Sequence, residues 1–122
     1  MPEPIENLDE RLKQGVDYFN REYFFEAHDA LEELWMEARE AVSRDLFHGL
    51  VNLATGFYHF RMNNFVGMQS QLQKGLAKLE KLPSPCHGVA LAPLVSCVKS
   101  FIGLAPANAH VAPPLPRIFV QP

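Results

Sequence analysis

The sequence predicts an all-α fold, a compact array of about five helices with a largely buried third helix and an extended, Pro-rich C-terminal tail. Three observations support this prediction. Apolar residues recur at helical spacing, breaks rich in Asn, Pro and Gly separate these periodic segments, and proline is concentrated after Ala105. We therefore expect a single helical domain over residues 1–104 and a tail, residues 105–122, that packs on it.

The first helix is expected to begin after Asn7, which favours the N-cap, with Glu10 placed to complete a capping box. Asn20-Arg21-Glu22 is the expected turn that follows it.

The second helix is predicted over about residues 23–41 and has two faces of opposite character. Its apolar face consists of Phe24, Ala27, Leu31, Leu34, Trp35 and Ala38. Its acidic face consists of Glu26, Asp29, Glu33, Glu37 and Glu40. His28 and Glu32 lie at the border between these faces, so they are placed to meet a neighbouring helix.

The third helix, with Ser43 as its expected cap, is apolar nearly all round, which predicts burial by neighbours on several sides. Its polar remainder is a narrow strip of His48, Asn52, Thr55 and His59. Gly49 and Gly56 lie beside this strip, and each costs about 1 kcal/mol of helix propensity relative to Ala. Their presence indicates that another backbone approaches closely there.

A break at Met62-Asn63-Asn64 precedes a fourth helix, which carries its lysines on the outer face. Residues 83–88 read as a loop, and a shorter fifth helix is expected to begin near Pro93. The segment Ile118-Phe119-Val120 is expected to make a strand-like contact or to lie over the core.

Composition and charge limit the classes of function. The chain has 122 residues, is 48% hydrophobic, and carries a formal net charge of −3, which gives no general attraction to nucleic acid. The acidic start, Met1-Pro2-Glu3-Pro4-Ile5-Glu6, is not a secretory signal, and no apolar run is long enough to span a membrane. Cys86 and Cys97 form no metal or redox motif, so we expect reduced thiols and a cytoplasmic location.

A short turn centred near Val42 and Ser43 would make the second and third helices antiparallel. Residues at the same height along the two helices would then have numbers that sum to about 85. This arrangement brings together five polar side chains as a candidate ligand pocket: His28, Glu32, Asn52, Thr55 and His59. Imidazole and carboxylate groups are common ligands of divalent metal ions, so His28, Glu32 and His59 are candidate metal ligands. His48 could reach only the Asn52 end of the strip or pair with Glu37.

Structural roles for the same side chains stay open. His28 beside Trp35, and His59 beside its aromatic neighbours, are typical of hydrogen-bonded structural histidines. Asn52 and Thr55 are equally consistent with bonding to the helix backbone or to buried water.

The segments Tyr23-Phe24-Phe25-Glu26-Ala27-His28-Asp29-Ala30-Leu31-Glu32-Glu33-Leu34-Trp35 and His48-Gly49-Leu50-Val51-Asn52-Leu53-Ala54, followed by Tyr58-His59, resemble the "domain of unknown function 309" family. The resemblance extends from about Leu12 to Lys81, and the closing Leu115-Pro116-Arg117-Ile118 is similar to that family's usual ending. It implies a compact helical array and a bacterial or archaeal cytosolic setting, with no established activity. Asp29 and His48 depart from the family pattern, where Glu and Gln are usual, which argues against a shared role for either.

Two functions are therefore carried forward. The first is a small polar pocket that binds a divalent metal ion or a small polar ligand, with hydrolytic chemistry as an option. The second is a non-catalytic interaction or structural module, a candidate homodimer, in which the His and Glu side chains form a buried hydrogen-bond network. The sequence does not decide whether the protein is an enzyme.

Overall fold

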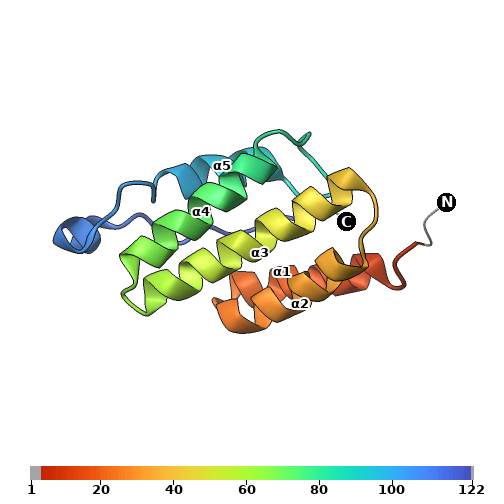
Figure 1. The fold of residues 1–122 in the computed structure, drawn as a ribbon, viewed down its shortest axis with the longest axis horizontal. Coiled ribbons are helices and arrows are strands. Elements are labelled where there is room, and N and C mark those ends of the chain that lie inside the picture. Colours follow the sequence, from red (N-terminus) through yellow and green to blue (C-terminus); the bar gives the residue numbers. More distant parts are fainter. Residues whose placement is uncertain (1–3, 122) are drawn as a thin grey trace.

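The computed structural model describes residues 4–121 and shows a helical array, as predicted (Figure 1). Met1, Pro2 and Glu3 of the acidic start, and Pro122 at the end of the predicted tail, lie outside the described residues. The elements, in chain order, are α1 (Leu8–Asn20), α2 (Phe24–Glu37), α3 (Ala41–Arg61), α4 (Phe65–Leu79), α5 (Leu91–Lys99) and the 3-10 helix η1 (Pro106–Val111).

Helices α2, α3 and α4 form one layer, with α3 in the middle (Figure 1). Helix α1 packs on α2, and α5 packs on α4. Eleven of the 21 residues of α3 are buried, which confirms that the third helix is largely enclosed. The Phe57 ring of α3 contacts the rings of Phe19, Phe24 and Phe101, at centroid distances of 6.0, 5.8 and 5.0 Å. These edge-to-face and tilted contacts join α1, α2 and the segment after α5 at the centre of the core.

The predicted capping box of α1 is wrong. The Asn7 backbone has a φ of 52°, in the left-handed region, and its side chain accepts no hydrogen bond from the first turn. The side chain of an N-cap residue accepts such a bond when the backbone of that residue is extended. The Asn7 backbone is not extended, so its side chain is not placed to accept the bond.

The turn between α2 and α3 lies earlier than the sequence predicted. Helix α2 ends at Glu37 rather than near Ala41, and α3 already begins at Ala41, so the turn is residues 38–40. Arginine side chains stabilise this early end, because the guanidinium groups of Arg39 and Arg44 donate to the Met36 and Ala38 carbonyls at 3.1 and 3.0 Å. These are terminal carbonyls that have no partner within a helix.

Ser43 was predicted to cap α3. Because α3 begins at Ala41, Ser43 lies inside the first turn instead. Its buried hydroxyl is 2.9 Å from the His87 Nε2 atom, which attaches the 83–88 loop to α3. His87 adopts a φ of 47°, so this contact holds a backbone conformation that L-residues rarely adopt.

Glycines let α3 and α4 approach closely, as the sequence predicted for Gly49 and Gly56. A β-carbon at Gly49 would lie 2.6 Å from Leu79 Cδ2, and one at Gly56 would lie 2.7 Å from Leu72 Cδ2. Gly75 of α4 contributes from the opposite side, since its β-carbon would lie 3.0 Å from the Gly49 carbonyl oxygen. The two leucine side chains occupy the space that the missing β-carbons leave.

The C-terminal part differs from the prediction in two respects. Helix α5 begins at Leu91 rather than near Pro93, and the tail contains η1, so it is not wholly extended. Val120 forms an isolated antiparallel bridge with Val89, Ile118 is buried, and the Asn20 side chain bonds both backbone groups of Ile118. The tail end therefore makes the strand-like contact and covers the core.

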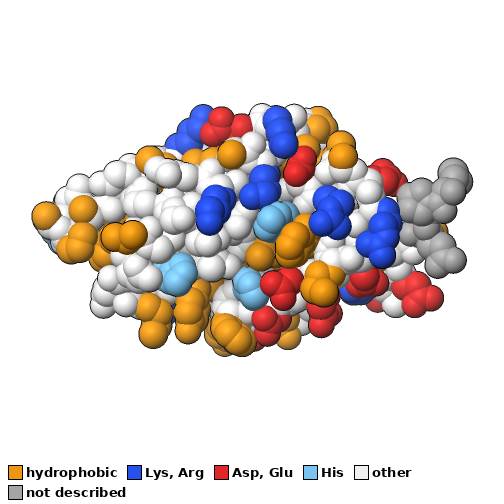
Figure 2. Space-filling model, viewed as in Figure 1, with side chains coloured by type: hydrophobic (Ala, Val, Ile, Leu, Met, Phe, Trp, Pro, Cys, Tyr) orange, Lys and Arg blue, Asp and Glu red, His pale blue; other side chains and the backbone are white. Residues whose placement is uncertain are grey.

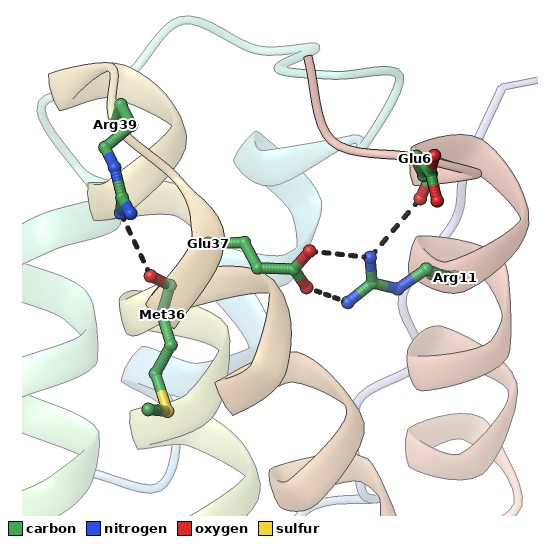
Figure 3. A network of polar contacts seen from close by, with 5 residues as sticks. All are labelled: Glu6, Arg11, Met36, Glu37 and Arg39. Carbon is green, nitrogen blue, oxygen red and sulfur yellow. Dashed lines mark hydrogen bonds and ion pairs between the residues drawn. The ribbon is translucent and has the colours of Figure 1, made fainter. Parts of the chain in front are cut away.

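A bidentate ion pair joins the N-terminal end of α1 to the C-terminal end of α2 (Figure 3). The Arg11 guanidinium donates to both oxygens of Glu37 and also reaches the Glu6 carbonyl at 3.3 Å. The hydrogen bond from Arg11 holds the pKa of the Glu37 carboxyl below its usual value.

Two further features agree with the sequence. Within residues 4–121, none of the helices combines the length and the apolar character that crossing a membrane requires. The thiols of Cys86 and Cys97 are not joined to each other, and burial raises the pKa of both.

We expect Gly75→Ala to destabilise the protein by about 1–3 kcal/mol, because the added methyl group meets the Gly49 carbonyl and the buried Leu53 side chain. The cost of this steric contact should exceed the roughly 1 kcal/mol that Ala gains over Gly in helix propensity, so the net change is destabilising. Urea unfolding measures the change, and Ser70→Ala, on the exposed face of the same helix, is the control. A stabilising Gly75→Ala change would show that the backbones are not closely packed there.

Candidate functional site

The register of α2 against α3 decides which polar side chains meet. The Phe25 and Tyr58 rings lie 6.1 Å apart, and the Trp35 and His48 rings are stacked at 4.0 Å. The residue numbers of both pairs, 25 with 58 and 35 with 48, sum to 83 rather than to the predicted 85. The sum is lower by two, the direction in which an earlier turn shifts it, and His28 is therefore level with Thr55.

A surface pocket of about 220 Å³ lies at this level, between α2 and the C-terminal half of α3. It is lined by Phe24, Phe25, His28, Thr55, Tyr58 and His59. Figure 2 shows His side chains on this face, with hydrophobic side chains near the lower edge and acidic side chains beside them. Three of the five predicted pocket residues, His28, Thr55 and His59, therefore come together.

His28 lies between two carboxylates of its own helix. Its Nδ1 atom is 3.1 Å from Asp29 Oδ1, and its Nε2 atom is 3.4 Å from Glu32 Oε2. The side chains of His28 and Glu32 are 30% and 41% exposed. These contacts lie at the surface, so the buried network expected in the structural alternative is not present at His28. Asp29, which the family pattern argued against, contacts His28 directly.

Thr55 and His59 each have one hydrogen-bonding group engaged and one left for a ligand. The Thr55 hydroxyl donates to the Val51 carbonyl at 2.9 Å, so its lone pairs stay available as acceptors. The Asn64 amide lies 3.2 Å from His59 Nδ1, and Asn64 also accepts from Gly67 N at 2.9 Å as the cap of α4. A donating amide assigns the His59 proton to Nε2, which makes that nitrogen a donor.

Asn52 does not take part in the pocket, contrary to the prediction. It is buried against α4, where its amide donates to Gln71 Oε1 at 3.0 Å and its oxygen accepts from Lys78 Nζ at 2.9 Å. The position of Asn52 around α3 points it toward α4, so its role is to connect these two helices.

His48 also belongs to a different group. Its ring stacks on Trp35, and the Arg44 guanidinium lies 5.6 Å from the centre of the Trp35 ring. Burial, followed by the positive charges of Lys78 and Arg44, lowers the pKa of His48. The predicted pairing of His48 with Glu37 is wrong, because Glu37 binds Arg11 instead.

The metal ligands predicted from the sequence are only partly assembled. Two of them, His28 and His59, line the pocket, and Glu32 reaches it through His28. Across residues 4–121, however, no three His, Cys, Asp or Glu side chains are arranged so that they could hold one metal ion. A metal bound here would therefore require side-chain movement.

The aromatic character of the pocket is not predicted from the sequence. Phe25 belongs to neither face of the predicted second helix, and Tyr58 is not among the predicted pocket residues. Phe25 is 56% exposed and lies over the Tyr58 ring. A sum of 83 in place of the predicted 85 sets these two residues level.

The family described as "Domain of unknown function (DUF309)" matches residues 12–71, which confirms the predicted resemblance over that segment. The match includes every residue that lines the pocket. No curated protein matches the chain.

Asn52→Ala is expected to lower the free energy of unfolding by about 1–3 kcal/mol, because it leaves the Gln71 and Lys78 groups without their buried partner. Chemical denaturation measures the loss. Gln73→Ala, on the outer face of α4, should change stability by less than about 0.5 kcal/mol. Equal effects of the two substitutions would contradict the role assigned to Asn52.

The lowered pKa of His48 predicts a specific pH dependence of stability. The unfolded chain binds the His48 proton more readily than the folded protein, so the free energy of unfolding decreases as the pH falls from above 6.5 toward the folded pKa. His48→Gln should remove this part of the pH dependence, as measured by urea unfolding at a series of pH values. His110→Gln, in the exposed η1 helix, should leave it unchanged; a dependence that survives His48→Gln would assign the effect to another group.

Proposed function

We propose, for a chain whose residues 12–71 match a family of unknown function, that the pocket between α2 and α3 binds a small planar organic molecule that is neutral or positively charged. The observation that carries this proposal is the combination of an aromatic lining with an acidic edge. About 220 Å³ is enough for a single substituted aromatic ring and too little for a nucleotide.

The aromatic side chains provide a surface for a flat ligand. Phe24, Phe25 and Tyr58 present ring faces or edges to the pocket, and such rings attract both planar groups and cations. Because Phe25 and Tyr58 are exposed, burying them beneath a ligand would also remove apolar surface from water.

The charges nearby select among ligands. Asp29 and Glu32 flank His28 at the pocket edge, and their negative potential favours a cation and disfavours an anion. The Thr55 hydroxyl oxygen can accept a hydrogen bond, and His59 can donate one. A ligand with an N–H group beside its planar part matches this arrangement.

These contacts support binding more than hydrolysis. The Thr55 hydroxyl donates its proton to the Val51 carbonyl, not to a histidine, so this hydroxyl is not activated by a neighbouring base. A cytoplasmic location and the absence of a nucleic-acid partner stay predictions from the sequence.

Three probes of one shape and different charge test the proposal: benzamidinium, benzamide and benzoate. We expect benzamidinium to bind best, with a Kd of about 1 mM, benzamide to bind more weakly, and benzoate to bind least. Shifts of the aromatic and histidine resonances in NMR titrations measure the affinities. Benzoate binding most tightly, or no shift with any probe at about 10 mM, would overturn the proposal.

Matched variants locate the binding. Phe25→Ala should weaken benzamidinium binding about 3- to 10-fold, because the ring that covers the ligand is lost. Phe119→Ala removes another exposed phenylalanine, outside the pocket, and should have no effect. Asp29→Asn combined with Glu32→Gln should reduce the preference for benzamidinium over benzamide while leaving benzamide binding unchanged.

A divalent metal ion is the second candidate ligand, supported by the two imidazoles in the pocket and by the contact between His28 and Glu32. Zn²⁺ titration of untagged protein by calorimetry tests it, with His59→Ala as the variant. One-to-one binding that His59→Ala weakens by about 10-fold or more would support a metal site. Binding that His59→Ala leaves unchanged would exclude these ligands.

A further inference from the structure

We infer that a second copy of this chain covers the face formed by α2, α3 and α4, which we call the open face. Helix α1, helix α5 and the tail lie behind this layer in Figure 1, and no part of residues 4–121 lies in front of it. The inference does not depend on the proposed ligand, because it is drawn from the charges on the two outer helices of the layer.

The open face carries opposite charges along its two edges. Asp29 and Glu32 lie on the α2 edge, and Lys74 and Lys78 lie on the α4 edge. In Figure 2, basic side chains lie over α4 and acidic side chains over α2, with His side chains between them, and further basic side chains lie toward the end where α2 meets α3. Within residues 4–121, no carboxylate lies within 4 Å of the ammonium group of Lys74 or Lys78.

The acidic and basic pairs lie at the same height along α3. The α2–α3 pairs sum to 83, so Glu32 is level with Val51. Helices α3 and α4 are in contact at His59 with Gly67 and at Asp45 with Lys81, and the residue numbers of each pair sum to 126. Val51 is therefore level with residue 75, which lies between Lys74 and Lys78. This match in height is what allows the face to complement itself.

A two-fold axis that lies in the interface and runs along α3 places α2 of one copy over α4 of the other. Each acidic pair then meets a basic pair, and symmetry repeats the contact. An in-plane axis perpendicular to α3 would instead bring α2 against α2, with like charges opposed. The charges therefore select the first arrangement.

The size and apolar content of the open face are sufficient for a stable contact. The 14, 21 and 15 residues of α2, α3 and α4 give about 75 Å of helix, and with about 9 Å between neighbouring axes the open face measures about 675 Å². A standard interface buries about 800 Å² on each partner. Met36 and Phe25, which are 65% and 56% exposed, provide apolar contacts along the α2–α3 seam.

Analytical ultracentrifugation of the full chain, without added ligand, tests the inference by charge reversal. The wild-type chain should sediment as a dimer of twice 13.8 kDa. Asp29→Lys/Glu32→Lys and Lys74→Glu/Lys78→Glu should each raise the dimer Kd by about 10-fold or more, because like charges then face each other. An equimolar mixture of the two variants should restore a dimer of wild-type affinity.

The control for net charge is Lys13→Glu/Lys99→Glu, which makes the same charge change on α1 and α5 and should leave the dimer intact. If Lys78→Glu prevents folding because the bond from Lys78 to Asn52 is lost, two single variants, Asp29→Lys and Lys74→Glu, can be mixed for the same complementation test. A monomeric wild-type chain, reversed variants that still dimerise, or folded variants that fail to restore a dimer on mixing would each overturn the inference. Since no probe is present, these outcomes are separate from failure of the ligand proposal.

Discussion

The close approach of α3 and α4 is the constraint on which the rest of the structure depends. Gly49 and Gly56 on α3, and Gly75 on α4, leave no β-carbon between the two backbones, and Leu72 and Leu79 fill that space. Each glycine lowers helix propensity by about 1 kcal/mol, so packing must offset that loss. Because α3 is then held between α2 and α4, its polar side chains either emerge on the outer side of the layer or, like Asn52 and Ser43, bond to a neighbouring segment.

The turn at residues 38–40 is the second determinant, since it sets the height of α2 against α3. Arginine donors satisfy the last carbonyls of α2, and a helix that ends at Glu37 places His28 opposite Thr55. The predicted sum of 85 would instead place His28 opposite Phe57, which is fully buried. The local capping of one helix end therefore decides whether a histidine meets a pocket or a core aromatic ring.

The sequence predicted the helices of the core well, and the site only in part. The apolar periodicity of residues 46–60 predicted burial, and the Gly spacing predicted a close contact, because both patterns reflect packing directly. Boundaries were less predictable. Side chains outside the helix or turn concerned, such as Arg44 for the end of α2 and His87 for Ser43, decided where α2 ended and what Ser43 contacted. An error of two residues in register then concealed the contact between Phe25 and Tyr58, and Asn52 was misassigned because its direction around α3 points to α4 rather than to α2.

The two proposals share the acidic edge of α2, and this connects them physically. Asp29 and Glu32 flank the pocket and also belong to the edge that would meet the partner's basic edge. A cation bound in the pocket would neutralise part of the charge that attracts the second copy, so binding and association would oppose each other. Linkage requires the opposition to be reciprocal: the dimer would weaken cation binding by the same factor by which the cation weakens the dimer. A neutral ligand of the same shape would lack this electrostatic opposition, so any competition that remained would arise from the space it occupies between the two copies.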